Sequence, residues 1–281
     1  MGLFNRGVVV PVLRFSGAIG MAAPLRPGLS IATLAGPIEK AFSMSRAKSV
    51  AVVINSPGGS PVQSSLLFRR LRQLADEKGK KIYVFCEDVA ASGGYYLAVA
   101  GDEIYADASS IVGSIGVISA SFGLDRAIEK LGISRRVYTA GTNKGALDPF
   151  QPEKAEDIER LKAIQRTVHD VFIGVVKDRR LGRIKGPDTE VFSGAFWSAP
   201  EALELGLIDG ISDVRTKMRE IHGPNVQLRV VAAERGLLSR MRKLPSVLGG
   251  GLGLGAHQGL AFADDLVSAV EIRALWSRFG L

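Results

Sequence analysis

The sequence predicts an α/β fold with a mainly parallel sheet, built from repeated β-α-β units and flanked by helices. Residues 49–55, "SVAVVIN" from the serine on, form an unbroken apolar run rich in β-branched residues. Such a run is typical of a strand buried on both faces of a parallel sheet. Residues 61–77 then have a helical period, and a second apolar run follows at 81–87. Strands that alternate with helices in this way predict the α/β class.

The first β-α-β unit has readable boundaries. Residues 8–17 predict a strand and residues 37–47 a helix that precedes the unit. Pro61 suits the first turn of the next helix, and Gly79 is typical of its end. The crossover of such a unit is expected to be right-handed, with its two strands neighbours or nearly so. The loops after the two strands should therefore face each other.

The alternation continues to about residue 225 without an internal repeat. In chain order we expect a short helix (92–101), two strands (103–106 and 111–118), a helix (123–132), a strand (135–141), a long amphipathic helix (152–180), and a helix ending at Gly206 with a short strand after it (199–211). These elements predict one domain over residues 1–225.

The remaining residues, 226–281, have a different character. They start with a candidate strand, "VQLRVV", and continue through a basic segment into the glycine-rich "GLGLG", which is typical of a flexible linker. A plausible amphipathic helix ends the chain. This basic C-terminal extension is expected to dock on the body or on a sister subunit, or to make peripheral contact with a membrane surface.

Composition narrows the classes of function. The chain has 281 residues, 46% of them hydrophobic, and a net charge of +8. This charge favours anionic surfaces, but the basic residues are dispersed and not interleaved with aromatics, which argues against nucleic-acid binding. The single cysteine, Cys86, leaves no partner for a disulfide within the chain and is expected to be a buried apolar residue.

The sequence has no evident secretory signal or transmembrane helix. Pro11 and Arg14 interrupt the apolar N-terminal run. The charge-free window at 244–263 contains six glycines and a proline, whereas a membrane-spanning helix needs about 20 predominantly apolar residues.

Two glycine-rich loops follow the strands of the first unit, "NSPGGS" at 55–60 and "DVAASGG" at 88–94. In open α/β sheets, ligands bind beyond the carboxyl ends of the strands. Ser92 begins a helix, where free N–H groups favour negative charge. It could attack a carbonyl while N–H groups of both loops hold the oxyanion, each contributing about 3 kcal/mol. Ser92 could equally be a helix N-cap, and "NSPGG" a simple turn.

A nucleophilic serine needs a base. His222 and His257 lie beyond the core elements, and His169 lies inside the long helix, which favours a packing role. No G-x-S-x-G motif is present. A lysine whose pKa is lowered by burial is the other option. Lys144 lies in a glycine-flanked loop, and these features alone are those of a solvated lysine.

Four segments, taken together, resemble peptidase family S49, the bacterial signal peptide peptidases of the SppA and SohB type. They are "INSPGGS", "ASGGYYLAVAGDEIYADASSIVGSIGVI", "GTNKGALDPF" and "FSGAFWSAPEALELGLIDGI". Their order and spacing agree with the family from about residue 8 to 215. The resemblance implies a ClpP/crotonase-like fold, a catalytic domain over residues 1–225, and a serine endopeptidase with a Ser–Lys dyad and an acyl-enzyme.

The resemblance also implies roles for individual residues. Carried over by motif, the nucleophile is Ser92, the general base Lys144, the serine that orients the lysine amine Ser114, and the oxyanion region Gly58, Gly59 and Gly93. No metal or cofactor is implied. The implied substrates are signal peptides and other small hydrophobic or unfolded segments.

The family forms rings or domes, so the resemblance implies a homo-oligomer, with the dyad inside one subunit or between neighbours. Members commonly carry an N-terminal membrane anchor, which is not evident here. We therefore expect a bacterial cytoplasmic location, with the C-terminal tail as a candidate contact to the inner membrane. The alternatives are a crotonase-type acyl-CoA enzyme and a non-catalytic, membrane-associated ring scaffold.

Overall fold

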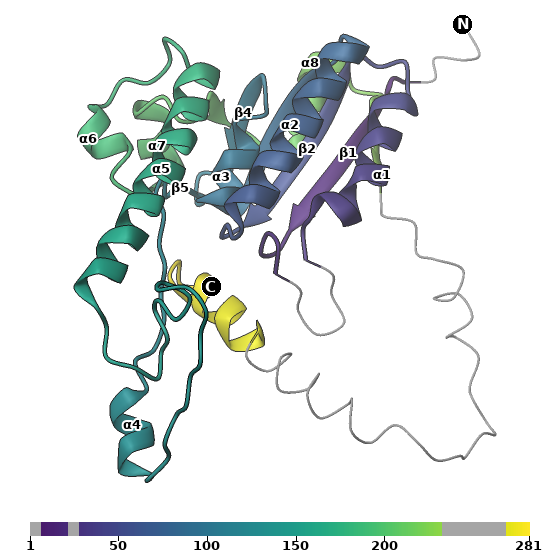
Figure 1. Cartoon of the computed structure of the whole chain (residues 1–281). Helices are drawn as coiled ribbons and strands as arrows, with labels where there is room; N and C mark the ends of the chain where they lie inside the picture. Colours follow the sequence, from purple (N-terminus) through teal and green to yellow (C-terminus); the bar gives the residue numbers. More distant parts are fainter. Residues whose placement is uncertain (1–6, 22–27, 232–267) are drawn as a thin grey trace, which may run out of the picture.

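A mostly parallel, eight-stranded sheet forms the centre of the computed structural model, which describes residues 7–21, 28–231 and 268–281 (Figure 1). Its main order is β6-β5-β3-β2-β1-β8, and β4 pairs with β3 and β7. Only the β5–β6 pairing is antiparallel among the described strands. The strands are β1 (Val9–Ser16), β2 (Ser49–Ser56), β3 (Lys81–Ala91), β4 (Glu103–Ala106), β5 (Ile111–Gly113), β6 (Phe196–Ser198), β7 (Gly210–Ile211) and β8 (Gln227–Val230). This sheet confirms the predicted α/β class.

Helices cover both faces of the sheet. They are α1 (Ile31–Ser43), α2 (Pro61–Lys78), α3 (Gly93–Ala98), α4 (Asp125–Lys130), α5 (Ala155–Arg179), α6 (Asp188–Val191), α7 (Ala199–Glu204) and α8 (Val214–His222). The first three pack on one face in the main core cluster, and α8 packs on the other through Met218. Strand β8 extends the sheet just past residue 225, the predicted domain boundary.

Strand β2 shows why the sheet is buried on both faces. Val52 and Ile54 belong to the core beneath α1 and α2, whereas Ala51 and Val53 belong to the core beneath α8. All four are at most 1% exposed. Burial of each Val or Ile side chain contributes about 1.5–3 kcal/mol, so the apolar run that predicted this strand also stabilises it.

Helix α2 has the predicted boundaries because its ends are capped. Pro61 occupies the first turn, and the Ser60 side chain accepts a hydrogen bond from the Gln63 N–H. At the other end Gly79 adopts a left-handed conformation with φ 59°. Glycine reaches that conformation without the steric cost of a Cβ.

Two predicted strands are wrong in whole or in part. The strand expected at 111–118 ends at Gly113, and the strand expected at 135–141 does not form. The first strand stops because Gly113 and Ser114 adopt positive φ, 108° and 53°. The second does not form because none of residues 118–156 is buried, so this part of the chain has no neighbouring strand with which to pair. We call residues 118–154, which run out from the body with α4 near the far end, the protruding segment (Figure 1).

The chain ends against the body. Residues 268–277 are helical. Trp276 and Phe279 pack on Val89 and Ala91, at the carboxyl end of β3, and on Ile111, the first residue of β5. The structure thus shows the last segment docked, while the glycine-rich linker lies outside the described residues and membrane contact stays a prediction. No described helix combines the length and apolar character that crossing a bilayer requires.

Candidate active site

The two glycine-rich loops are in contact at the carboxyl ends of β2 and β3, as the strand order predicted. A Cβ built on Gly58 would lie 2.8 Å from Ser92 Cβ and 2.9 Å from Gly93 N. Distances this short leave no room for a side chain at residue 58. Glycine is therefore required there because the second loop approaches so closely.

Ser92 has a strained backbone with φ 52° and ψ −121°. Its N–H donates to the Gly113 carbonyl at 2.8 Å, and its own carbonyl accepts from the Tyr96 N–H at 2.9 Å. It occupies the N-cap position of α3, yet its side chain makes no capping hydrogen bond. Strain of this kind costs about 1–3 kcal/mol and is concentrated at functional sites. The geometry therefore favours a reactive hydroxyl over a helix cap.

Two backbone amides beside Ser92 are available to a ligand. The N–H groups of Gly59 and Gly93 donate to no described residue. A Cβ on Gly93 would lie 3.4 Å from Gly59 N, so the two groups are close neighbours. The Gly58 N–H, in contrast, already donates to Ser56 Oγ at 3.2 Å. Paired free amides of this kind can stabilise a developing negative charge.

Ser114 lies next to Ser92 across the sheet. Ala91 pairs with Gly113 in the β3–β5 register, and each serine is the residue that follows. Ser114 also has a positive φ, 53°, and is 5% exposed. Its N–H donates to the Ala195 carbonyl at 2.7 Å, whereas its hydroxyl bonds to no described residue.

Within one chain, Lys144 does not share the buried surroundings of Ser92 and Ser114. It is exposed in a turn of the protruding segment, and its amine bonds to no described residue, Ser92 and Ser114 included. The turn nevertheless carries strain, because Leu147 has φ 58°. Ser92, Ser114 and Leu147 are the described non-glycine residues with positive φ, and each lies in a segment that carries the family resemblance.

The described histidines do not supply a base to Ser92. His169 Nε2 is 2.9 Å from the Ile115 carbonyl, so its ring holds the loop after Ser114, a contact that no sequence signal indicated. His222 Nε2 is 2.8 Å from Ser49 Oγ, at the amino end of β2 and thus at the opposite edge of the sheet. Burial lowers the pKa of His222 below its usual value.

A small hollow of about 60 Å³ opens beside Ser92. Its apolar lining comes from three helices and the loop after β5, and consists of Pro61, Tyr96, Val117, Val168, Val171 and Phe172. Sequence reasoning missed this lining because α5 reaches the site only through tertiary packing. The hollow suits a small apolar group.

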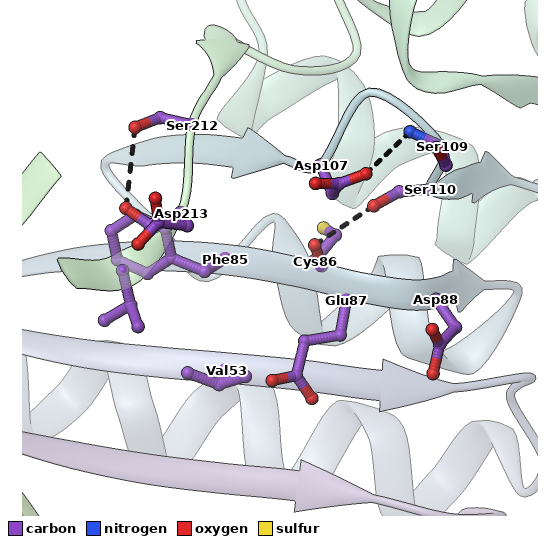
Figure 2. A pocket seen from close by; sticks show the side chains of 11 residues that line it. Val53, Phe85, Cys86, Glu87, Asp88, Asp107, Ser109, Ser110, Ser212 and Asp213 are labelled. Carbon is purple, nitrogen blue, oxygen red and sulfur yellow. Dashed lines mark hydrogen bonds between the residues drawn. The ribbon is translucent and has the colours of Figure 1, made fainter. Parts of the chain in front are cut away.

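A larger hollow of about 500 Å³ lies on the sheet face that α8 covers (Figure 2). Its four carboxylates all have partners: Glu87 pairs with Arg14, Asp88 with Asn55, Asp107 with the Ser109 N–H, and Asp213 with the first turn of α8. Cys86, also at this hollow, is 3% exposed as predicted, and burial raises the pKa of its thiol to about 12. These groups are therefore occupied or unreactive.

The family model of peptidase family S49 matches residues 75–227, which is more than half of the chain and includes Ser92, Ser114 and Lys144. The chain belongs to peptidase family S49. Its sheet and flanking helices accordingly have the ClpP/crotonase-like fold. The matching model describes a peptidase family, and one curated relative is named a serine protease.

Curated relatives resemble the chain over different spans. "Na(+)/H(+) antiporter NhaA" of Brucella abortus is 54% identical over 97% of this chain, which spans 37% of that protein. "Serine protease SPPA, chloroplastic" of Arabidopsis thaliana is 33% identical over 73% of this chain and 32% of its own length. "Protease 4" of Salmonella typhi is 30% identical over 74% of this chain and 33% of its own length. The chain thus spans about a third of each of these relatives.

Proposed function

We propose that this S49 peptidase is a serine endopeptidase with Ser92 as nucleophile and Lys144 as general base. The observation that carries the proposal is the strained backbone of Ser92, whose hydroxyl bonds to no described residue, beside the free amides of Gly59 and Gly93. Those two amides form the oxyanion hole. Gly58 belongs to it as the residue whose missing Cβ lets the loops meet.

The proposed reaction proceeds through an acyl-enzyme. As Ser92 Oγ bonds to the substrate carbonyl carbon, its proton moves to the neutral Lys144 amine, and the carbonyl oxygen becomes an oxyanion. Ser114 Oγ orients the amine. When the intermediate collapses, the C–N bond breaks and the Lys144 ammonium returns the proton to the leaving amine. Water, activated by the same amine, then hydrolyses the ester.

Lys144 reaches Ser92 in an assembly with a second copy of the chain. A lysine acts as a base when its surroundings favour the neutral amine, and an exposed side chain lacks such surroundings. Large apolar residues of the protruding segment are also uncovered, with Phe122 81%, Leu131 72% and Tyr138 91% exposed. Several large apolar side chains left exposed in one segment favour a surface that a partner covers. The proposed homo-oligomer would cover the Lys144 side chain as well as these apolar residues.

The proposed substrates are signal peptides and other small hydrophobic or unfolded segments. The hollow beside Ser92 supports this class because it is small and mostly apolar, lined by Val117, Val168 and Phe172 among others. A peripheral membrane contact through residues 226–281, and a cytoplasmic location, remain predictions. Flotation of vesicles with the full chain and with a chain lacking residues 238–281 would test the contact.

Peptide cleavage by matched variants tests the proposed dyad. We expect Ser92→Ala and Lys144→Ala each to lower kcat/KM roughly a thousandfold or more, since both residues act in the same step. Ser109→Ala and Lys78→Ala, at exposed residues outside the proposed site and the protruding segment, serve as controls. Circular dichroism checks the fold of each variant. Full cleavage by either dyad variant would contradict the assignment.

The crotonase-type alternative makes a different prediction. The shared fold and paired amides also suit a thioester oxyanion, but that chemistry has no use for a strained Ser92. Hydration of an enoyl-CoA that survives Ser92→Ala would favour it. A scaffold without activity would show neither reaction. Ion transport is stated in the names of the Brucella relatives, of which this chain spans 37%, and is not proposed for this chain.

A further inference from the structure

An ion pair joins the two sides of the turn that carries Lys144. Arg135 Nε donates to Asp148 Oδ2 at 2.8 Å. The other carboxylate oxygen, Asp148 Oδ1, accepts from the Phe150 N–H at 3.1 Å. The Arg135 guanidinium also lies 4.9 Å from the centre of the Phe150 ring, within cation–π range. The chain from 135 to 148 is thereby closed into a loop with Lys144 inside it.

This ion pair is unusual for so exposed a segment. The Asp148 side chain is only 7% exposed, whereas that of Arg135 is 43% exposed. The Asp148 carboxylate accepts two directed hydrogen bonds, from Arg135 and from the Phe150 N–H, and loss of Arg135 would remove the charged one. The pair is therefore a specific contact and not one of many transient surface pairs.

The Arg135–Asp148 pair stays ionised over the pH range in which a lysine can act as a base. The hydrogen bond from Arg135, and then that from the Phe150 N–H, hold the pKa of Asp148 below its usual value. Because this pKa is lowered by folding, the ion pair stabilises the fold fully at pH values above the pKa of Asp148 in the unfolded chain, about 3.9. The stabilisation is lost as the pH falls through the lower pKa of the folded chain. The contact is thus intact at neutral and alkaline pH.

The strained backbone of the same turn needs stabilising contacts from neighbouring residues. Leu147, directly before Asp148, has φ 58°, a conformation that a leucine adopts only when its surroundings impose it. The Asp148 bonds lie next to this residue. A second tie, from the Leu124 N–H to the Pro149 carbonyl at 2.6 Å, fixes the base of the segment. The turn is therefore held in one shape although it is exposed.

We propose that Arg135 and Asp148 are positioning residues that fix the turn so that the Lys144 amine is presented to Ser92. This inference rests on the proposed dyad. Neither residue touches the reacting atoms. Their effect reaches the reaction through the place of Lys144, and misplacement of a catalytic group by about 1 Å can cost about a hundredfold in rate.

Steady-state peptide cleavage by Arg135→Ala, Asp148→Asn and Arg135→Lys tests the proposal. The first two variants should lower kcat roughly tenfold to a hundredfold and leave KM within about twofold. They should also shift the acid limb of the kcat/KM pH profile, because the surroundings of the Lys144 amine change. Arg135→Lys keeps the charge and should restore most of kcat. Arg136→Ala, an exposed neighbour with no described ion pair, is the matched control.

Size-exclusion chromatography should show the same assembly for all variants, and thermal unfolding should show that Arg135→Ala and Asp148→Asn remain folded at the assay temperature, although the lost ion pair lowers their stability. The positioning role is wrong if Arg135→Ala and Asp148→Asn keep the wild-type kcat and the wild-type acid limb of the kcat/KM pH profile while Lys144→Ala is inactive. Loss of assembly together with activity would overturn it as well, because the pair would then be an assembly contact. Full cleavage by Lys144→Ala would instead overturn the dyad, and this inference with it.

Discussion

At Ser92, the β3–β5 register and the start of α3 together force a positive φ. The N–H is bonded to Gly113 and the carbonyl to Tyr96, so the backbone cannot relax. The proximity of Ser92 to the glycine loop could be predicted from strand order, because both loops follow neighbouring parallel strands. That the Gly59 N–H is free while the Gly58 N–H is not could not be predicted, because it depends on a hydrogen bond from the Gly58 N–H to Ser56 Oγ.

The strain at Ser92 should be measurable as stability. The free energy of unfolding of Ser92→Gly should exceed that of Ser92→Ala by about 1 kcal/mol, since both lack the hydroxyl and only glycine adopts φ 52° freely. Urea denaturation measures the difference. Ser65→Gly, inside helix α2, is the control and should be less stable than Ser65→Ala by up to about 1 kcal/mol. Lower stability of Ser92→Gly than of Ser92→Ala would refute the strain.

At the scale of the element, predictions succeeded where local pattern and tertiary context agree. The apolar run of β2 and the capped α2 were predicted nearly to the residue. Strand β3 was predicted to end at residue 87 but continues to Ala91, because its last residues pair with β5. Helix α8 was missed, although Asp213 is a readable N-cap whose side chain accepts from two N–H groups.

A buried arginine connects the end of α5 with the residues that follow α7 and precede β7. Arg180, 2% exposed at the end of α5, donates through Nε and Nη2 to the Gly206 carbonyl, which follows α7. Its Nη1 donates to Asp209 at 2.7 Å, just before β7. Arg180→Ala should therefore lower the free energy of unfolding by about 3 kcal/mol or more, because the buried Gly206 carbonyl and one oxygen of Asp209 lose their charged hydrogen-bond donor.

Chemical denaturation of Arg180→Ala beside Arg183→Ala checks this expectation. Arg183 pairs with the same carboxylate but is 44% exposed in its side chain, so its loss should cost about 1 kcal/mol or less. Equal losses of unfolding free energy in the two variants would show that burial of the arginine does not determine the loss.

At the scale of the whole molecule, one chain does not bring all the proposed site residues together. Ser92, Ser114 and the two free amides lie together, whereas Lys144 lies in the protruding segment, none of which is buried. No sequence pattern could show this, because the partners that would cover the segment are not neighbours in the chain. The docked residues Trp276 and Phe279 pack against the end of β3 that leads into Ser92.

Complementation tests whether the dyad is completed between copies. Ser92→Ala and Lys144→Ala, each inactive alone, should regain part of the wild-type cleavage when unfolded together and reassembled. Mixed assemblies would contain some sites with an intact Ser92 from one copy and an intact Lys144 from another. Size-exclusion chromatography must show the same assembly for all samples. Mixed assemblies without activity would place both residues of each dyad in one copy.

Active-site labelling of the full chain tests the central claim most directly. A fluorophosphonate probe reacts with a serine whose hydroxyl is activated by a base beside an oxyanion hole. Mass spectrometry of the labelled, digested protein should find the adduct on Ser92, with none in Ser92→Ala and a severe reduction in Lys144→Ala. An adduct on a different serine, or undiminished labelling of Ser92 in Lys144→Ala, would contradict the proposed dyad.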